Sequence, residues 1–85
     1  YALGQNFPNP FNPSTTIKFA LPKNSEVKLT VYDILGRSVI TLVDAKFQAG
    51  YHEVQFNASR LASGVYFYRI EAGNFTKVKK LMLLK

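Results

Sequence analysis

Apolar and polar residues alternate without interruption between positions 26 and 32, and this pattern constrains the fold more than any other. Val27, Leu29 and Val31 share one parity, and charged or hydroxyl side chains occupy the positions between them. Because successive side chains of a strand point to opposite faces, the alternation predicts a strand with one buried and one exposed face. Such a strand needs neighbours to pair with and a second apolar layer to cover it.

Similar patterns predict five further strands, separated by turn residues. They are expected at residues 17–21, 37–43, 52–56, 64–71 and 75–84. The strand at 37–43 is apolar on both faces, which leaves its register open. Gly36 closes the turn before it and is expected at positive φ. Residues 57–64 are too polar and small for a strand, and we expect one helical turn there that places Leu61 in the core.

Short strands, regular turn signals and the absence of a long helical period indicate an all-β fold. The most consistent arrangement is a small antiparallel β-sandwich of about six to seven strands, with a small barrel as the alternative. The chain has 85 residues, of which 47% are hydrophobic, so it can form a single globular domain.

Residues 6–13 hold three of the four prolines, alternating with asparagine. Proline fixes φ and disfavours helical geometry in the residue before it, so this segment is extended or turned. Phe7 and Phe11 are expected to dock it on the domain as two hydrophobic pegs. We therefore expect residues 1–14 to form an arm along the domain edge and residues 15–85 to form the sandwich. The chain begins with Tyr1, and we expect it to be a piece of a longer protein.

The last expected strand has no clean parity. If Leu81 and Leu83 face inward, so do Lys77 and Lys79 in an unbroken strand. A bulge at positions 79–80 would remove this conflict, because it inserts one extra residue and re-aims those that follow. Met82 and Leu84 would then face outward. An exposed apolar edge invites a partner strand, so the segment 79–84 is the expected docking edge.

The residues needed for catalysis are scarce. The chain has one histidine, no cysteine and five carboxylates, and the carboxylates fall on outward faces or at turns. No metal-ligand spacing and no glycine-rich phosphate loop occurs. We therefore expect no enzyme activity, no catalytic residues, no bound metal and no cofactor. No apolar run reaches the roughly 20 residues of a membrane helix, so no membrane insertion is expected.

The net charge of +6 favours acidic partners. Lysines near the C-terminus and the aromatic run at positions 66–68 could suggest single-stranded nucleic acid. However, alternation buries part of that aromatic surface, and lysines on an edge strand also discourage aggregation. We therefore expect no nucleic-acid partner.

Four blocks of the sequence resemble the type A C-terminal sorting domain of the type IX secretion system, found on secreted proteins of Bacteroidetes and related phyla. The blocks are QNFPNPFNPSTTI at 5–17, VYDILGR at 31–37, LASGVYFYR at 61–69 and KLMLLK at 80–85. Their order and spacing match across essentially the whole chain.

The resemblance implies a small Ig-like sandwich that acts as a non-catalytic export signal for a covalently attached N-terminal cargo. The cargo would reach the periplasm, cross the outer membrane through the type IX translocon, and be secreted or held at the cell surface. A sortase-like peptidase would commonly remove the domain and could exchange it for a surface anchor. The resemblance assigns translocon recognition to Gly64, Val65, Tyr66, Lys79, Lys80, Leu81, Met82, Leu83, Leu84 and Lys85.

Two other functions remain open at this point. One is a carbohydrate- or surface-binding accessory module of an extracellular enzyme, suggested by the sandwich, the aromatics and the positive charge. The other is an Ig-like assembly domain, which would form concentration-dependent oligomers. As a sorting domain, the chain is expected to be a monomer.

Overall fold

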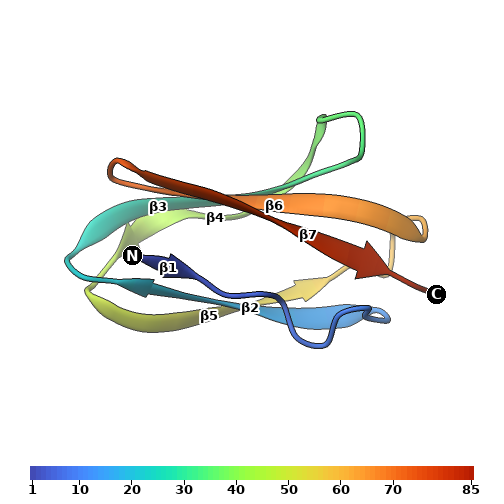
Figure 1. Ribbon diagram of the computed structural model, residues 1–85, viewed down its shortest axis with the longest axis horizontal. Helices are drawn as coiled ribbons and strands as arrows, with labels where there is room; N and C mark the ends of the chain where they lie inside the picture. The colour runs from blue at the N-terminus through green and yellow to red at the C-terminus, as the bar shows by residue number, and fades with distance from the viewer.

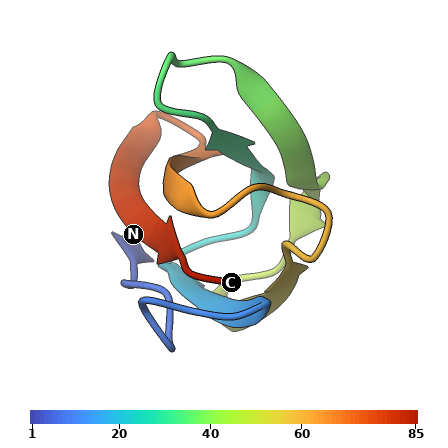
Figure 2. The same cartoon turned by 90° about the vertical axis from the view of Figure 1, so that its right-hand side faces the viewer.

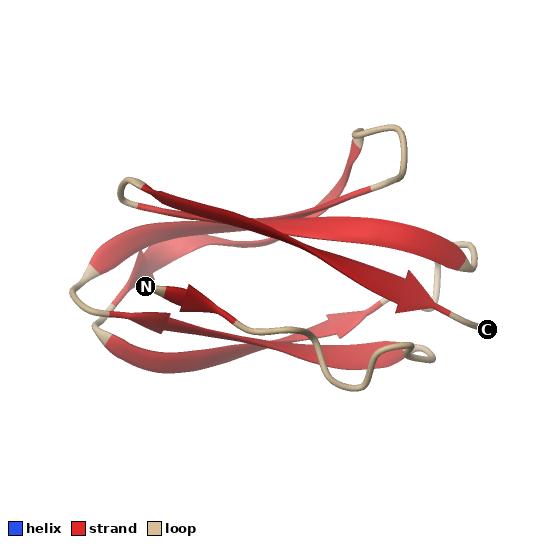
Figure 3. Cartoon of the chain, in the orientation of Figure 1, coloured by secondary structure: helices blue, strands red, loops and turns tan.

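The computed structural model describes residues 1–85 and contains strands but no helix (Figure 3). The seven strands are β1 (Ala2–Leu3), β2 (Ser14–Leu21), β3 (Ser25–Tyr32), β4 (Ser38–Phe47), β5 (Gly50–Asn57), β6 (Gly64–Ala72) and β7 (Phe75–Leu83). They form two antiparallel sheets with the orders β1-β2-β5 and β4-β3-β6-β7. The expected all-β sandwich is confirmed.

The two sheets lie face to face, and Figures 1 and 2 show the two layers from the side and from one end. The core between them consists of sixteen buried apolar residues. The alternating strand at 26–32 behaves as expected, because Val27, Leu29 and Val31 are all at most 1% exposed. In β2, Ile17, Phe19 and Leu21 are likewise buried.

The strand β4 extends further than expected, to Phe47, and its pairing with β3 shifts register twice. The shifts follow Leu29 and Val31. They accommodate the sequence that is apolar on both faces, because Val39, Leu42 and Val43 pack against the core while Ile40 stays 43% exposed.

The expected helical turn between β5 and β6 is wrong. The segment contains one hydrogen-bonded turn, in which the Leu61 N–H donates to the Ala58 carbonyl at 3.0 Å, and no helix. Ala58 is the residue that enters the core, with 1% exposure, whereas Leu61 is only partly buried. Ala58 directly follows the end of β5, and its N–H donates to the Pro13 carbonyl at 2.9 Å.

The N-terminal segment adds a strand that the sequence pattern does not indicate. Ala2 and Leu3 pair with Ala20 and Phe19, forming β1 at the edge of the smaller sheet. The β1–β2 connection, residues 4–13, then crosses from this sheet to the edge of β7. In Figure 2 the connection and β7 lie at the same edge of the sandwich.

Of the two expected pegs in this connection, one is correct. Phe11 is 2% exposed and its ring lies 5.9 Å from that of Phe56. Phe7 is 79% exposed, so its expected role as a peg is wrong. Its backbone pairs with Thr16 in a single antiparallel bridge, which directs the side chain of Phe7 away from the core.

Candidate functional site: the last strand and the connection that covers it

The hairpin of β6 and β7 is paired without any irregularity. Its register is continuous from Gly64 opposite Leu83 to Ala72 opposite Phe75. The expected bulge at positions 79–80 is therefore wrong. Leu81 and Leu83 are fully buried, and Lys77 and Lys79 share their parity. This is possible because β7 is an edge strand, where a long lysine side chain on the inner parity can keep its charged end in water.

The opposite parity of β7 faces outward, as expected for Met82 and Leu84. Met82 is 36% exposed, Leu84 is 52% exposed and Lys80 is exposed as well. The outer parity also includes Val78, at 52% exposure. The outer face of β7 and the residue after it thus form a row of exposed apolar side chains interrupted by one charge, that of Lys80.

The second segment assigned by resemblance, Gly64 to Tyr66, lies directly beside this row. Val65 pairs with Met82 and is half-buried, whereas Tyr66 pairs with Leu81 and is buried. The Tyr66 hydroxyl donates to the Ala62 carbonyl at 2.7 Å. The register therefore brings both assigned segments together, but it places Tyr66, Leu81 and Leu83 in the core.

The terminal residue Lys85 is fixed to the preceding loop. Its backbone N–H donates to the Ser63 hydroxyl at 3.0 Å, and its side-chain ammonium donates to the Ser59 carbonyl at 2.6 Å. The segment after Leu83 therefore returns toward the start of β6 and does not extend into solvent.

The free edge of β7 is covered over its last part by the β1–β2 connection. The Phe11 N–H donates to the Met82 carbonyl and the Phe11 carbonyl accepts from the Leu84 N–H, both at 3.0 Å. The Asn9 side-chain oxygen accepts from the Met82 N–H at 2.9 Å, and the Gln5 side-chain amide donates to the Lys80 carbonyl at 2.8 Å. The expectation of an open docking edge at 79–84 is therefore wrong from the Lys80 carbonyl onward.

Tyr68 holds the start of the connection in place. This fully buried residue of β6 accepts a hydrogen bond from the Asn6 N–H at 2.8 Å and donates one to the Gly4 carbonyl at 2.7 Å. Burial raises the pKa of the Tyr68 hydroxyl from 10.0 to about 12, against the smaller lowering effect of the Asn6 N–H. The phenol is therefore neutral at physiological pH and can act as donor and acceptor at once.

A small polar network stabilises the turn that follows. The buried Asn6 side chain donates to the Pro8 carbonyl and to the Thr15 hydroxyl, both at 3.1 Å. Thr15, also buried, donates to the same Pro8 carbonyl at 2.8 Å. Every member of this network has a partner, which is the condition under which buried polar groups stabilise a fold.

Gly64 occupies a backbone conformation that other residues rarely adopt, with φ of 155°. We expect Gly64→Val to lower the free energy of unfolding by about 1–3 kcal/mol. No atom lies within 4 Å of the position that a Cβ would take, so the effect comes from the backbone alone. Gly64→Ala should therefore also destabilise, though less than valine. Thermal unfolding measures both, and a neutral Gly64→Ala would contradict the explanation.

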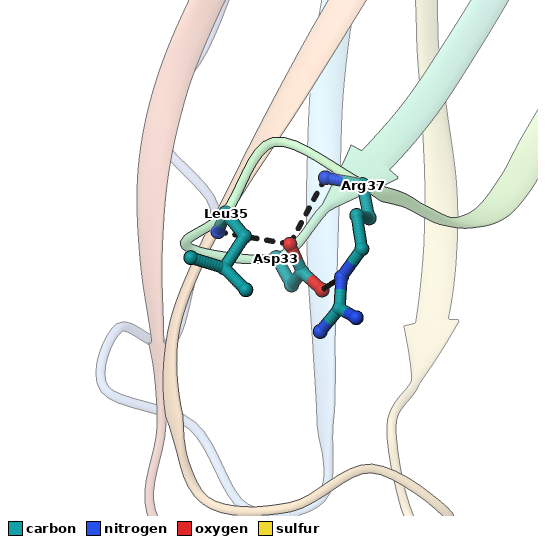
Figure 4. Close-up of polar contacts among 3 residues, drawn as sticks. All are labelled: Asp33, Leu35 and Arg37. Carbon is teal, nitrogen blue, oxygen red and sulfur yellow. Dashed lines mark hydrogen bonds and ion pairs between the residues drawn. The ribbon is translucent and has the colours of Figure 1, made fainter.

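The loop between β3 and β4 is ordered by one carboxylate (Figure 4). One oxygen of Asp33 accepts from the N–H groups of Leu35 and Arg37, at 2.9 and 3.0 Å. The other oxygen pairs with the Arg37 guanidinium at 2.8 Å. Ile34 and Leu35 are held at the tip, 71% and 73% exposed. The sequence predicts this turn and the positive φ of Gly36, 83°, but not the exposure of two aliphatic side chains.

The hydrogen bond from the Arg37 N–H is the largest influence on the Asp33 carboxyl, and the pKa is lowered from its ordinary 3.8. A lowered folded pKa stabilises the fold at pH above 3.8, and this contribution is lost as pH falls through the folded value. We expect Asp33→Asn to lower the melting temperature at neutral pH and to have a smaller effect in strong acid. Asp44→Asn is the control. An Asp33→Asn difference that does not change with pH would contradict this.

A comparison with known protein families matches residues 5–84 to the family described as the secretion system C-terminal sorting domain. The match covers nearly the entire chain and includes the four sequence blocks, except for Lys85 at the end of the last one. The chain belongs to this family. It is a C-terminal sorting domain of the type IX secretion system. A search of curated proteins gave no significant match.

Sorting domains of this family direct export to the cell surface or the medium across the outer membrane. The family is non-catalytic in general, and membership implies interaction with the type IX machinery. The structure contains no helix of the length and apolarity needed to cross a membrane.

Proposed function

We propose that the translocon recognises this sorting domain as a folded surface, formed by the outer face of β7 and the start of β6. One observation carries the proposal: three of the four family blocks, distant in sequence, meet at β7. The block at 5–17 bonds to the β7 edge, the block at 61–69 pairs with it, and the last block forms its end.

The ten residues assigned by resemblance then divide into three groups. Leu81, Leu83 and Tyr66 are buried and shape the strand, whereas Lys80, Met82 and Leu84 are accessible to a partner. We infer that contact is made by the accessible residues, together with Val65 and the terminal Lys85. Gly64 acts through its backbone conformation at the start of β6, and Lys79 lies on the inner parity of β7, beside its free edge.

In this scheme the cargo is joined to the N-terminal side, and the translocon transfers it across the outer membrane. A sortase-like peptidase on the cell surface then removes the domain or exchanges it for a surface anchor. In Figure 1, Tyr1 lies toward one end of the long axis and Lys85 at the other. This separation supports the proposal, because a partner at Lys85 leaves the cargo junction free.

The test is a fusion of residues 1–85 to a periplasmic reporter in a host with this secretion system. Deleting residues 80–85 is a poor control, because it removes two core leucines and unfolds the domain. Met82→Ser with Leu84→Ser changes the accessible apolar row and leaves the core intact. We expect this variant to retain the reporter in the periplasm, whereas the equally exposed Ile40→Ser should be exported normally. Equal export of all three fusions would refute the proposed surface.

A second candidate function is glycan binding on the outer face of the smaller sheet. Two adjoining shallow grooves there, of about 530 and 450 Å³, share Lys18 and Glu53 as lining residues. Tyr51, 93% exposed, borders one groove and Phe7, 79% exposed, borders the other. Exposed rings beside polar groups match the chemistry of sugar recognition, in which rings stack and polar groups donate or accept hydrogen bonds.

Retention on insoluble polysaccharide tests this candidate. Tyr51→Ala and Phe7→Ala should abolish retention, while Ile34→Ala should not. Because the net charge of +6 can hold the protein on anionic polymers, the assay is repeated at high salt, where charge-driven retention is screened. Wild-type protein that is never retained, or is retained only at low salt, excludes this function.

A further inference from the structure

The free edge of β7, which faces away from β6, differs between the two halves of the strand. In an antiparallel pair, alternate residues direct their N–H and C=O groups toward the partner strand or away from it. The bonds made by Lys80, Met82 and Leu84 to the β1–β2 connection show that the even positions of β7 face away from β6. The N–H and C=O groups of Thr76 and Val78 therefore face away as well.

These groups have no partner in the protein. None of the backbone bonds outside the sheets involves Thr76 or Val78, and no side chain bonds to their backbone. The Lys80 N–H is unpaired in the same way, although its carbonyl is bound by Gln5. The connection thus covers the edge from the Lys80 carbonyl onward and leaves the preceding half open. The side chains of Thr76 and Val78 are exposed.

The charged side chains that β7 itself contributes to this open half are all lysines. Lys77 and Lys79 lie on the inner parity and Lys80 on the outer one, while Arg69 stands opposite Val78 on β6. One carboxylate, Glu71, stands opposite Thr76 on β6, and it is paired with the Arg69 guanidinium at 3.2 Å. Two copies of this edge would bring their lysines together, so the charges oppose self-association and favour an acidic partner.

We propose that the open half of β7, from Thr76 to Lys80, receives an extended acidic segment of the secretion machinery as an added β-strand. The inference rests on the proposed function and names the partner chemistry at the same strand. Added strands gain affinity from main-chain hydrogen bonds and specificity from alternate side chains. Carboxylates at every second position of the incoming segment would face Lys77 and Lys79. The β1–β2 connection shows that this edge accepts strand-like pairing, since Phe11 is bridged to Leu83.

Val78→Pro tests the proposal by removing one backbone N–H group from the open half of β7. Proline lacks the N–H, and at an outward position of an edge strand it leaves the bonds to β6 intact. We expect the variant to fold and its reporter fusion to be exported about tenfold less than the wild-type fusion. The loss of one hydrogen bond that leaves the partner's acceptor unpaired predicts a decrease of this size. Val78→Ala removes the same side chain but keeps the N–H, so its fusion should be exported about tenfold better than the Val78→Pro fusion. Export of a folded Val78→Pro fusion at the wild-type level overturns the proposal.

A charge variant covers the case in which Val78→Pro fails to fold. Lys77→Glu with Lys79→Glu should reduce export, whereas Lys23→Glu with Lys46→Glu carries the same net charge at exposed positions elsewhere and should not. Equal export of the two double variants overturns the proposal. Light scattering distinguishes a second copy as occupant: a wild-type dimer that Val78→Pro converts to a monomer also overturns it.

These outcomes are separable from those of the proposed function. If the Met82 and Leu84 variant loses export while Val78→Pro and the lysine variant do not, the outer face is recognised and strand addition is wrong. If none of the variants loses export, the proposed recognition surface fails as a whole.

Discussion

Phe11→Ala is expected to lower the free energy of unfolding by about 3–5 kcal/mol, the usual effect of removing a buried aromatic ring from a core. Phe11 is 2% exposed, packs against Phe56 and lies where the β1–β2 connection bonds to β7. A domain of this size has a total stability toward the lower end of the usual range. The melting temperature should fall by more than about 10 °C.

Phe7→Ala is the matched control, because it makes the same chemical change four positions earlier in the same motif. Phe7 is 79% exposed, and its removal should change stability by no more than about 0.5 kcal/mol. Denaturant unfolding of both variants measures the difference. Similar losses in the two variants would show that the connection is not docked through Phe11.

The second large effect is expected from Tyr68→Phe, which should cost about 2–3 kcal/mol. The substitution keeps the ring but removes the hydroxyl that bonds to the Asn6 N–H and the Gly4 carbonyl, at 2.8 and 2.7 Å. Both backbone groups would lose their partner beside the core. Tyr66→Phe is the control. Its hydroxyl makes one partly buried bond, to Ala62, so the cost should be about 1 kcal/mol or less.

Two further measurements separate this role of Tyr68 from simple packing. The Asn6 amide should lose its protection from hydrogen exchange in Tyr68→Phe and keep it in Tyr66→Phe. The pH dependence gives the second: with a folded pKa of about 12 against 10.0, neutral Tyr68 stabilises the fold below pH 10.0. That contribution is lost as pH rises toward about 12. Tyr68→Phe should lack this alkaline loss, and identical alkaline profiles would contradict the assignment.

The sequence was sufficient to predict the sandwich, because its evidence is periodic and local. Alternation identified the buried residues of β2 and β3, and glycine and asparagine identified the turns. The family blocks identified the class of protein. Each of these signals lies within a few consecutive residues and does not depend on where the segment sits in the folded domain.

The incorrect predictions share one physical origin: they concern properties that depend on where a segment lies in the folded domain. The bulge is wrong because inward parity does not imply burial in an edge strand, whose inward positions can lie at the rim of the sandwich, where Lys77 and Lys79 reach water. Phe7 and Phe11 have the same local chemistry, and only the path of the connection decides which one is buried. The bonds from Gln5 and Asn9 to β7 span 75 and 73 positions and leave no periodic signal.

Because these bonds join distant parts of the sequence, the recognition surface depends on the complete fold. The covered edge of β7 forms only when residues near position 5 meet residues near position 80 in the finished fold. A misfolded copy contains the complete motif sequences and still lacks the assembled surface. A receptor that binds this surface therefore binds only the completely folded domain, so recognition also tests whether the domain has folded correctly.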